Sequence, residues 1–149
     1  FNKVCHQNRW VGFFSDTSRG YKYSRKLMAS QPLGDLLTRL LEMTNEIFGT
    51  SFNGILVNYY ANGEENIGDH SDDEKGLHNG MVVALSLGAE RKFRIRDKKT
   101  KKTVKEILTK DSTYLIMNGD FQKEFTHGIP AEKDITDWRC SFTFRSHSD

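Results

Sequence analysis

Three residues in the second half of the chain, His70, Asp72 and His127, have the side chains of a metal centre. Two histidines and one carboxylate form the facial triad that binds ferrous iron and leaves three coordination positions open for a cosubstrate and dioxygen. His70 and Asp72 are two residues apart, so both side chains point to the same face if they lie at a strand end. This set of residues therefore predicts an oxidative reaction.

The His-x-Asp tripeptide is weak evidence by itself, because the chain contains a second copy at His147 to Asp149. We expect that copy to lie at an unanchored C-terminus, where nothing orients two ligands. His127 stands before Gly128 and Pro130, at a predicted strand end that can aim the ring into a barrel mouth. A lone histidine is more often a surface or core residue, which is our interpretation of His78 and His6.

The segment Trp138 to Arg145 alternates between apolar and polar residues. Trp138, Cys140, Phe142 and Phe144 share one face, and Arg139, Ser141, Thr143 and Arg145 share the other. A half-exposed strand gives the same pattern. The alternative is that the apolar face packs between two sheets while the arginines point into a barrel. Buried cations need anions, and a dicarboxylic acid fits two guanidinium groups.

Asn58 and Tyr60 share a face with Leu56 on a second predicted strand, opposite Ile55 and Val57. An amide and a phenol on an inward face can complete the hydrogen bonds of a bound acid. A strand end that meets solvent is the simpler alternative. The combination with the two arginines favours a binding site.

The elements that position these residues follow from hydrophobic periodicity. Residues 1–30 form an irregular lid with strand-like pieces at 9–14 and 20–24, and residues 31–49 form a helix. The apolar stripe of this helix, expected to cover a sheet, comprises Leu33, Leu36, Leu37, Leu40, Leu41, Thr44, Ile47 and Phe48. Strands are predicted at 52–60, before Asp72, and at 81–87, 92–97, 103–108, 112–117, 125–127 and 138–145. This order predicts a mostly β fold with one helix (α+β), a double-sheet jelly roll, in which residues 50–149 form the core.

The bulk composition indicates one domain of 149 residues, 1–149, with a net charge of +2. The only cysteines are Cys5 and Cys140, and no segment resembles a signal peptide or a membrane span, so we expect an intracellular protein. Because the chain begins at Phe1 and not at Met, we expect native residues to precede it. The basic residues of 91–105 can bind phosphates, or they can be the solvated lysines of a hairpin that protects an edge strand; they are Arg91, Lys92, Arg94, Arg96, Lys98, Lys99, Lys101, Lys102 and Lys105.

These motifs together resemble the AlkB-like iron(II) and 2-oxoglutarate dioxygenases, in particular the nucleic-acid alkylation-repair branch. The resemblance covers essentially the whole chain. NYYANGEENIGDHSDDEKGL is similar to that branch's Asn-x-Tyr and His-x-Asp-Asp-Glu motifs, MVVALSLGAERKFRIR to its Ser-x-Gly-Ala-x-Arg-x-Phe strand pair, and RCSFTFR to its Arg-x-Asn-x-Thr-Phe-Arg ending. The resemblance implies a double-stranded β-helix.

The resemblance also implies roles for the site residues. His70, Asp72 and His127 would bind Fe(II). The residues implied for 2-oxoglutarate are Asn58, Tyr60, Arg139, Ser141, Thr143 and Arg145. Arg139 and Tyr60 would bind the distal carboxylate, while Arg145 and Asn58 would lie near the metal. Ser141 departs from the family's usual Asn, and its shorter side chain would lose a contact or reach the acid through water.

The same resemblance assigns SRGYKYSR to nucleotide recognition in the lid. Tyr23 would stack on a flipped base opposite His70, and Tyr21 and Ser24 would contact the nucleotide backbone. Asp73 and Glu74 would accept hydrogen bonds from an exocyclic amine, and Phe1 aligns with a residue that fills the gap left by a flipped base. A sticky rim loop is the alternative interpretation of this basic and aromatic stretch.

The function implied is oxidative demethylation of N-alkylated bases, 1-methyladenine and 3-methylcytosine, with release of formaldehyde, succinate and CO2. Fe(2+) and 2-oxoglutarate would be the cofactors. The partner would be alkylated DNA or RNA, with no membrane, and we expect a monomer in the nucleus or cytoplasm. Two alternatives stay open: a 2-oxoglutarate-dependent protein hydroxylase, and a non-catalytic metal- or nucleic-acid-binding barrel.

Overall fold

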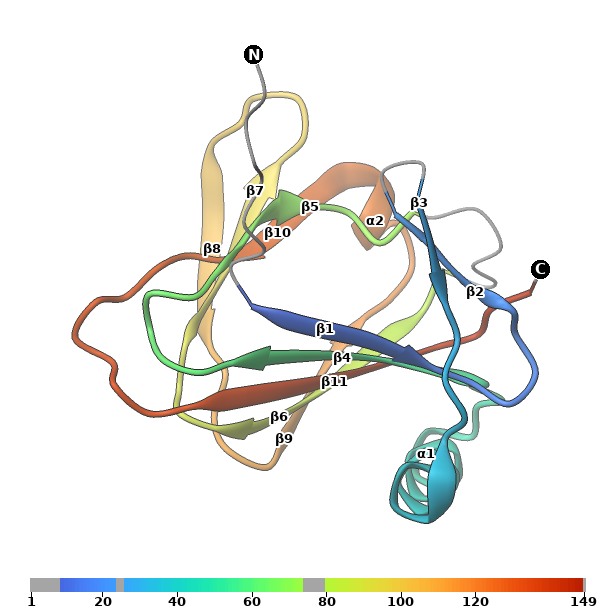
Figure 1. Ribbon diagram of the computed structural model, residues 1–149. Coiled ribbons are helices and arrows are strands. Elements are labelled where there is room, and N and C mark those ends of the chain that lie inside the picture. The colour runs from blue at the N-terminus through green and yellow to red at the C-terminus, as the bar shows by residue number, and fades with distance from the viewer. Residues whose placement is uncertain (1–8, 24–25, 74–79, 149) are drawn as a thin grey trace.

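The protein is described here by a computed structural model that covers residues 9–23, 26–73 and 80–148, with only the backbone described at 21–23 and 26–27. Its main feature is a pair of antiparallel sheets (Figure 1). The major sheet has the order β1 (Trp10–Phe14), β4 (Gly54–Tyr60), β11 (Arg139–Arg145), β6 (Val82–Gly88) and β9 (Thr113–Met117). The minor sheet has the order β5 (Ile67–His70), β10 (Phe125–Ile129), β7 (Lys92–Asp97) and β8 (Thr103–Leu108). The predicted double-sheet jelly roll is confirmed.

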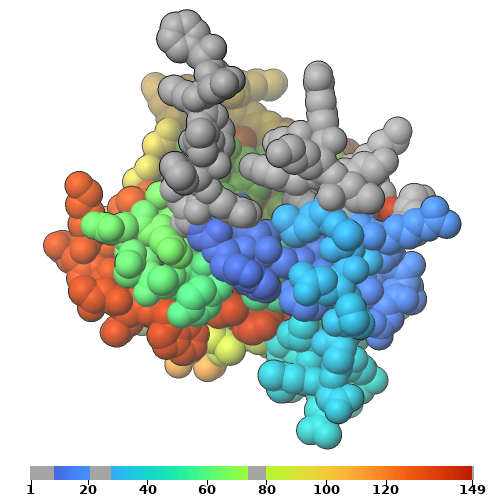
Figure 2. Space-filling model, in the orientation of Figure 1, coloured from blue at the N-terminus to red at the C-terminus, as the bar shows by residue number. Residues whose placement is uncertain are grey.

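The N-terminal segment, predicted as a lid over residues 1–30, divides into two structures. β1 is an edge strand of the major sheet, paired with β4, and β2 (Gly20–Tyr23) and β3 (Lys26–Ala29) form a separate hairpin. In the space-filling view of Figure 2, β1 (dark blue) lies between the β2–β3 hairpin (lighter blue) and the connection from β4 to β5 (green). The hairpin, and not the whole segment, is therefore the candidate lid.

Helix α1 (Gly34–Phe48) covers the face of the major sheet that points away from the minor sheet (Figure 1). It ends at Gly49, whose φ of 62° is a left-handed conformation that favours glycine, and whose N–H donates to the Asn45 carbonyl oxygen. It begins three residues later than predicted, because Gln31 exchanges backbone hydrogen bonds with Phe13 and Ser15 instead.

The predicted apolar stripe of α1 is partly wrong. Leu33 and Leu41 are buried against the sheet, but Leu36 is 78% exposed and Ile47 is 57% exposed. The predicted stripe spans more of the helix circumference than one flat sheet can cover, so its outer edge stays in solvent.

The two larger hydrophobic clusters of the described residues lie on the two faces of the major sheet. Phe144, Ile55 and Val83 pack under α1, whereas Tyr60, Val82 and Phe93 belong to the core between the sheets. The prediction that the apolar face of 138–145 packs between the sheets is therefore wrong. That face meets the apolar side of α1, and the opposite face of β11 points inward with its polar residues.

The C-terminal end of the chain is anchored, contrary to the prediction for His147. The His147 side chain is buried, its Nδ1 lies 3.0 Å from Ser18 Oγ, and its backbone N–H donates to Asn53 Oδ1 at 2.7 Å. This histidine fixes the end of the chain to the segment before β2 and takes no part in the His70 cluster. No membrane crossing is possible for either helix of the described part of the chain, since neither is long and apolar enough.

Candidate active site

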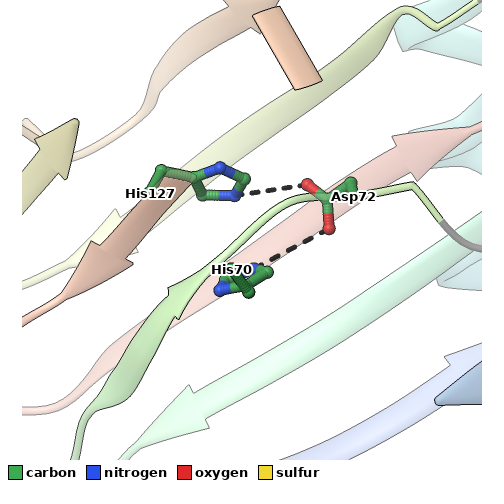
Figure 3. A group of neighbouring side chains, drawn as sticks. All are labelled: His70, Asp72 and His127. Atoms are coloured by element: carbon green, nitrogen blue, oxygen red, sulfur yellow. Dashed lines mark ion pairs between the residues drawn. The ribbon is translucent and has the colours of Figure 1, made fainter. Parts of the chain in front are cut away.

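The three predicted metal ligands converge at one end of the minor sheet (Figure 3). His70 is the last residue of β5 and lies opposite His127 of β10 in the strand register. Asp72 lies two residues beyond β5, not on the strand as predicted, and still turns its carboxylate toward both rings. His127 Nε2 is 3.3 Å from Asp72 Oδ2, His70 Nε2 is 3.8 Å from Asp72 Oδ1, and one ligand atom from each residue lies within 4.8 Å of the others.

The orientations of the two rings suit metal binding. His70 Nδ1 lies 2.8 Å from the carbonyl oxygen of Gly68 and donates to it, so Nε2 carries the lone pair that faces Asp72. The ring of His127 stacks on Phe93 with a centroid distance of 5.1 Å and an angle of 17°. The hydrogen bond to Gly68 therefore fixes the His70 ring, and the stacking on Phe93 fixes the His127 ring, so that both metal-binding nitrogens are held in place.

The charge states of the cluster also fit a divalent ion. Burial, together with the neighbouring His127, lowers the pKa of His70, so its imidazole is neutral at neutral pH. Burial by itself would raise the pKa of Asp72, but Arg145, His127 and His70 hold that pKa well below its ordinary value. Neutral imidazoles and an ionised carboxylate are the forms that bind metal. The three residues present thus fit Fe(II).

A second group of polar residues lines the same cavity, between the sheets. All the residues predicted to bind the dicarboxylate line it together with the three metal ligands: Asn58, Tyr60, Arg139, Ser141, Thr143 and Arg145. Asn58 and Tyr60 come from β4, and the other four come from the inward face of β11, which pairs with β4 residue by residue. The half-exposed strand alternative for β11 is excluded, because Arg139 is 3% exposed and Arg145 is 1% exposed.

Arg139 carries a buried charge for which the described residues supply no carboxylate. Its Nη2 donates to Ser86 Oγ at 2.9 Å, and its guanidinium lies 5.5 Å from the ring centroid of Tyr60. Burial lowers the pKa of Arg139 and raises the pKa of Tyr60. A buried cation without a carboxylate partner is costly, so an anion bound at this end of the cavity would stabilise Arg139.

Arg145 marks the metal end of the cavity. Its Nη2 is 3.5 Å from Asp72 Oδ1, which places a second guanidinium directly beside the metal ligands. Asn58 is nearby in the cavity, and its Oδ1 accepts a 2.7 Å hydrogen bond from Arg9 Nε. A dicarboxylate between Arg139 and Arg145 would therefore have one end beside the metal and the other beside Tyr60.

Several residues of the site were not predicted. Arg9 and Ser86 line the cavity, and Gln122 accepts the backbone N–H of Asp72. Ser86 lies opposite Ser141 in the register of β6 and β11, so the period-two alternation of β6 could have revealed it once the pairing was known. Arg9 and Gln122 act from a loop and a one-turn helix, α2 (Phe121–Glu124), where periodicity gives no signal.

The predicted basic cluster of 91–105 is only partly a surface feature. Arg91 does not belong to it, because its side chain is 1% exposed and its Nη atoms bond to loop carbonyl oxygens. Arg94 pairs with Glu106 and Arg96 pairs with Asp69, each at 3.4 Å. The exposed lysines remain along the β7–β8 hairpin, and β8 is an edge strand, as the hairpin alternative predicted.

The base-recognition residues remain predictions. Asp73 is exposed beside the metal ligands, and Met28 of β3 lines the cavity, which brings the β2–β3 hairpin to the site. Tyr21 and Tyr23 lie on β2, with only their backbone described. Phe1, Ser24 and Glu74 lie outside the described residues.

Comparison with known proteins decides the family. The family model of the 2OG-Fe(II) oxygenase superfamily matches residues 1–145. The chain belongs to this superfamily. Its similarity to alkB homologues supports an AlkB-like member of the superfamily. The superfamily implies Fe(2+) and 2-oxoglutarate, and His70, Asp72 and His127 are a possible iron site.

Curated relatives of this oxygenase include two kinds of alkB homologue. The DNA oxidative demethylase ALKBH2 of Mus musculus is 31% identical over 153 residues, which cover 97% of this chain and 64% of that protein. The alpha-ketoglutarate-dependent dioxygenase alkB homolog 3 of Homo sapiens is 34% identical over 136 residues, which cover 85% of this chain and 48% of that protein. The oxygenase chain thus spans roughly half to two thirds of the length of these relatives. The solved structure of OsALKBH1 has a TM-score of 0.63 at 18% identity, covers 93% of this chain and 78% of its own, and supports the jelly-roll fold.

Proposed function

We propose that this oxygenase demethylates N-alkylated bases in DNA or RNA, with 1-methyladenine and 3-methylcytosine as substrates and formaldehyde, succinate and CO2 as products. The observation that carries the proposal is one cavity that joins the His70, Asp72 and His127 cluster to the buried Arg139. The relatives named as a DNA oxidative demethylase and as an alkB homologue support the substrate class.

The residues of the cavity divide the work of such a reaction. His70, Asp72 and His127 would hold the iron, which supplies the oxidative chemistry when it is bound with 2-oxoglutarate and dioxygen. Arg139 and Tyr60 would hold the distal carboxylate of 2-oxoglutarate, because they form the buried end that lacks an anion among the described residues. Arg145 would orient the other end and keep Asp72 ionised.

The nucleic acid would be held outside this cavity. The β2–β3 hairpin reaches the cavity at Met28 and carries Tyr21 and Tyr23, which would clamp an extruded base. Lys99, Lys101 and Lys102 are exposed at the tip of the β7–β8 hairpin and would contact phosphates. A protein substrate would need neither group.

The test is formaldehyde release and product mass with a panel of oligonucleotides carrying 1-methyladenine or 3-methylcytosine, as single-stranded and duplex DNA and RNA. We expect turnover that His70→Ala and Asp72→Ala both abolish. Replacing the three lysines with Ala should raise KM for a long oligonucleotide, flatten its salt dependence, and leave KM for a methylated mononucleotide unchanged. Succinate formation that a peptide stimulates and no methylated oligonucleotide does would support the hydroxylase alternative. No succinate with either substrate would support the non-catalytic barrel.

A further inference from the structure

Asp72 is the metal ligand with the least support from secondary structure. His70 and His127 face each other on paired strands, but Asp72 lies past the end of β5, where no strand partner accepts its backbone N–H. Its carboxylate also has competing partners, because Arg145 Nη2 lies 3.5 Å from Oδ1 and the two histidines lie close to the same group. A carboxylate in this position needs an anchor if it is to stay aimed at the metal.

Gln122 supplies that anchor. Its Oε1 accepts the backbone N–H of Asp72 at 2.8 Å, and its Nε2 points to Met117 Sδ at 3.6 Å. The side chain is 6% exposed, so neither partner is replaced easily by solvent. Since a backbone N–H can only donate, the amide oxygen must face Asp72, and the orientation of the amide is therefore determined.

The hydrogen bond made by the neighbouring residue Ser71 cannot replace the one made by Gln122. Ser71 Oγ donates to the carbonyl oxygen of Phe125 at 2.7 Å, which holds the peptide before Asp72 against β10. This bond does not involve Asp72, and among the described residues Gln122 alone hydrogen-bonds to the Asp72 backbone. Without it, a buried N–H would be left unpaired, and the segment would turn to find another acceptor.

We propose that Gln122 is a positioning residue for the metal: by holding the Asp72 backbone it keeps the carboxylate between the two histidines and prevents its closure onto Arg145. Groups that support a metal ligand in this way typically change metal affinity 10- to 100-fold when they are lost. The inference rests on the iron and 2-oxoglutarate chemistry of the family and not on the proposed nucleobase substrate.

The test is the Mn(II) affinity of the metal-stripped protein, measured from the EPR signal of free Mn(II). Gln122→Met and Gln122→Ala both remove the acceptor, one with similar volume and one without, so that a folding failure of either leaves the other for measurement. We expect the Mn(II) Kd to rise about 10- to 100-fold in both. Gln122→Glu, which retains an acceptor oxygen, should restore most of the affinity.

The matched control is Asn45→Leu. The Asn45 amide also accepts a backbone N–H at 2.8 Å, from Phe52, but it lies on α1 on the far side of the major sheet. The Asn45→Leu variant should lower thermal stability about as much as the Gln122 variants do, and should leave the Mn(II) Kd unchanged. In turnover assays the Gln122 variants should show a raised apparent KM for iron and a kcat that recovers when iron is saturating.

A Mn(II) Kd for Gln122→Met or Gln122→Ala within threefold of the Asn45→Leu value would overturn the proposal. A Gln122→Glu variant no better than Gln122→Met would do the same, because it would show that volume and not the acceptor matters. Mn(II) binding needs no nucleic acid, so a failure of the methylated-oligonucleotide assay leaves this result interpretable, and the reverse also holds.

Discussion

Arg91 should contribute more to stability than any surface cation of the same hairpin. Its guanidinium donates to four backbone carbonyl oxygens, those of Glu65 at 2.8 Å, Pro130 at 2.9 Å, and Asn62 and Gly63 at 3.3 Å. These bonds join the connection between β4 and β5 to the loop after β10, beside Tyr60, whose ring centroid is 5.4 Å away. Replacement with Met keeps most of the side-chain volume and leaves the carbonyl groups without their donor.

The cost follows from the bond lengths. A hydrogen bond from a charged donor is worth about 1.5 to 3 kcal/mol, and the two short bonds alone then give about 3 to 6 kcal/mol. Relief of the buried charge offsets part of this, so we expect Arg91→Met to lower the free energy of unfolding by about 3 kcal/mol. The free energy of unfolding of Arg91→Lys should lie between those of the wild type and Arg91→Met, because one ammonium cannot span the same four acceptors.

Equilibrium unfolding in urea, followed by tryptophan fluorescence, measures this difference. The control is Arg94→Met on the adjacent strand, which removes a half-exposed 3.4 Å ion pair with Glu106 and should cost less than about 1 kcal/mol. If the two variants unfold at free energies within about 1 kcal/mol of each other, the reasoning about Arg91 is refuted.

Three further predictions concern single ionisable groups. Arg139→Met should leave the ligand-free protein as stable as the wild type or more stable, because it removes a buried charge, and should abolish the thermal stabilisation by 2-oxoglutarate; a large loss of ligand-free stability in the same thermal-shift assay would contradict this. In a Cys5→Ser background, Cys140 should react with a thiol reagent at pH 8 roughly 100-fold more slowly than a free cysteine, because burial raises the pKa of Cys140 from 9.0 to about 11. A rate equal to that of free cysteine would contradict this and show that the thiol is accessible. The metal-free protein should lose stability as the pH falls below about 6.5, because the pKa of His70 is lower in the folded state than in the unfolded state, which takes up the proton first. Urea unfolding between pH 8 and pH 5 should show this slope reduced in His70→Gln, and an unchanged slope would exclude His70 as its source.

The parts of the site that were predictable from the sequence are those carried on strands. The alternation in Arg139 to Arg145 determines which side chains share a face, and the structure confirms that the two arginines lie on the same buried face of β11. The same alternation does not say which face points inward, and the apolar face was therefore placed on the wrong side of the sheet. α1 decides that question through its packing, which a local pattern does not contain.

Residues whose partners are backbone atoms escaped prediction. In the sequence Arg91 is one more cation in a basic run, because apart from Glu132 its partners are carbonyl groups of two distant loops, which any residue type carries. Gln122 was missed for the same reason, since it binds the N–H of Asp72 and not a side chain. His147 lies near the end of the chain, and no local pattern around it indicates the contacts with Asn53 and Ser18 that hold it.

The position of β11 has a consequence for biosynthesis. This strand is the last of the described strands in sequence order but lies in the middle of the major sheet, between β4 and β6. β4 and β6 therefore have no common neighbour until residues 139–145 have left the ribosome, and the nascent chain must carry exposed strand edges until then. The strand that completes the sheet also brings Arg139 and Arg145, so the sheet and its dicarboxylate site would be completed in one late step. A translating chain halted before residue 139 should therefore remain sensitive to protease and dependent on chaperones.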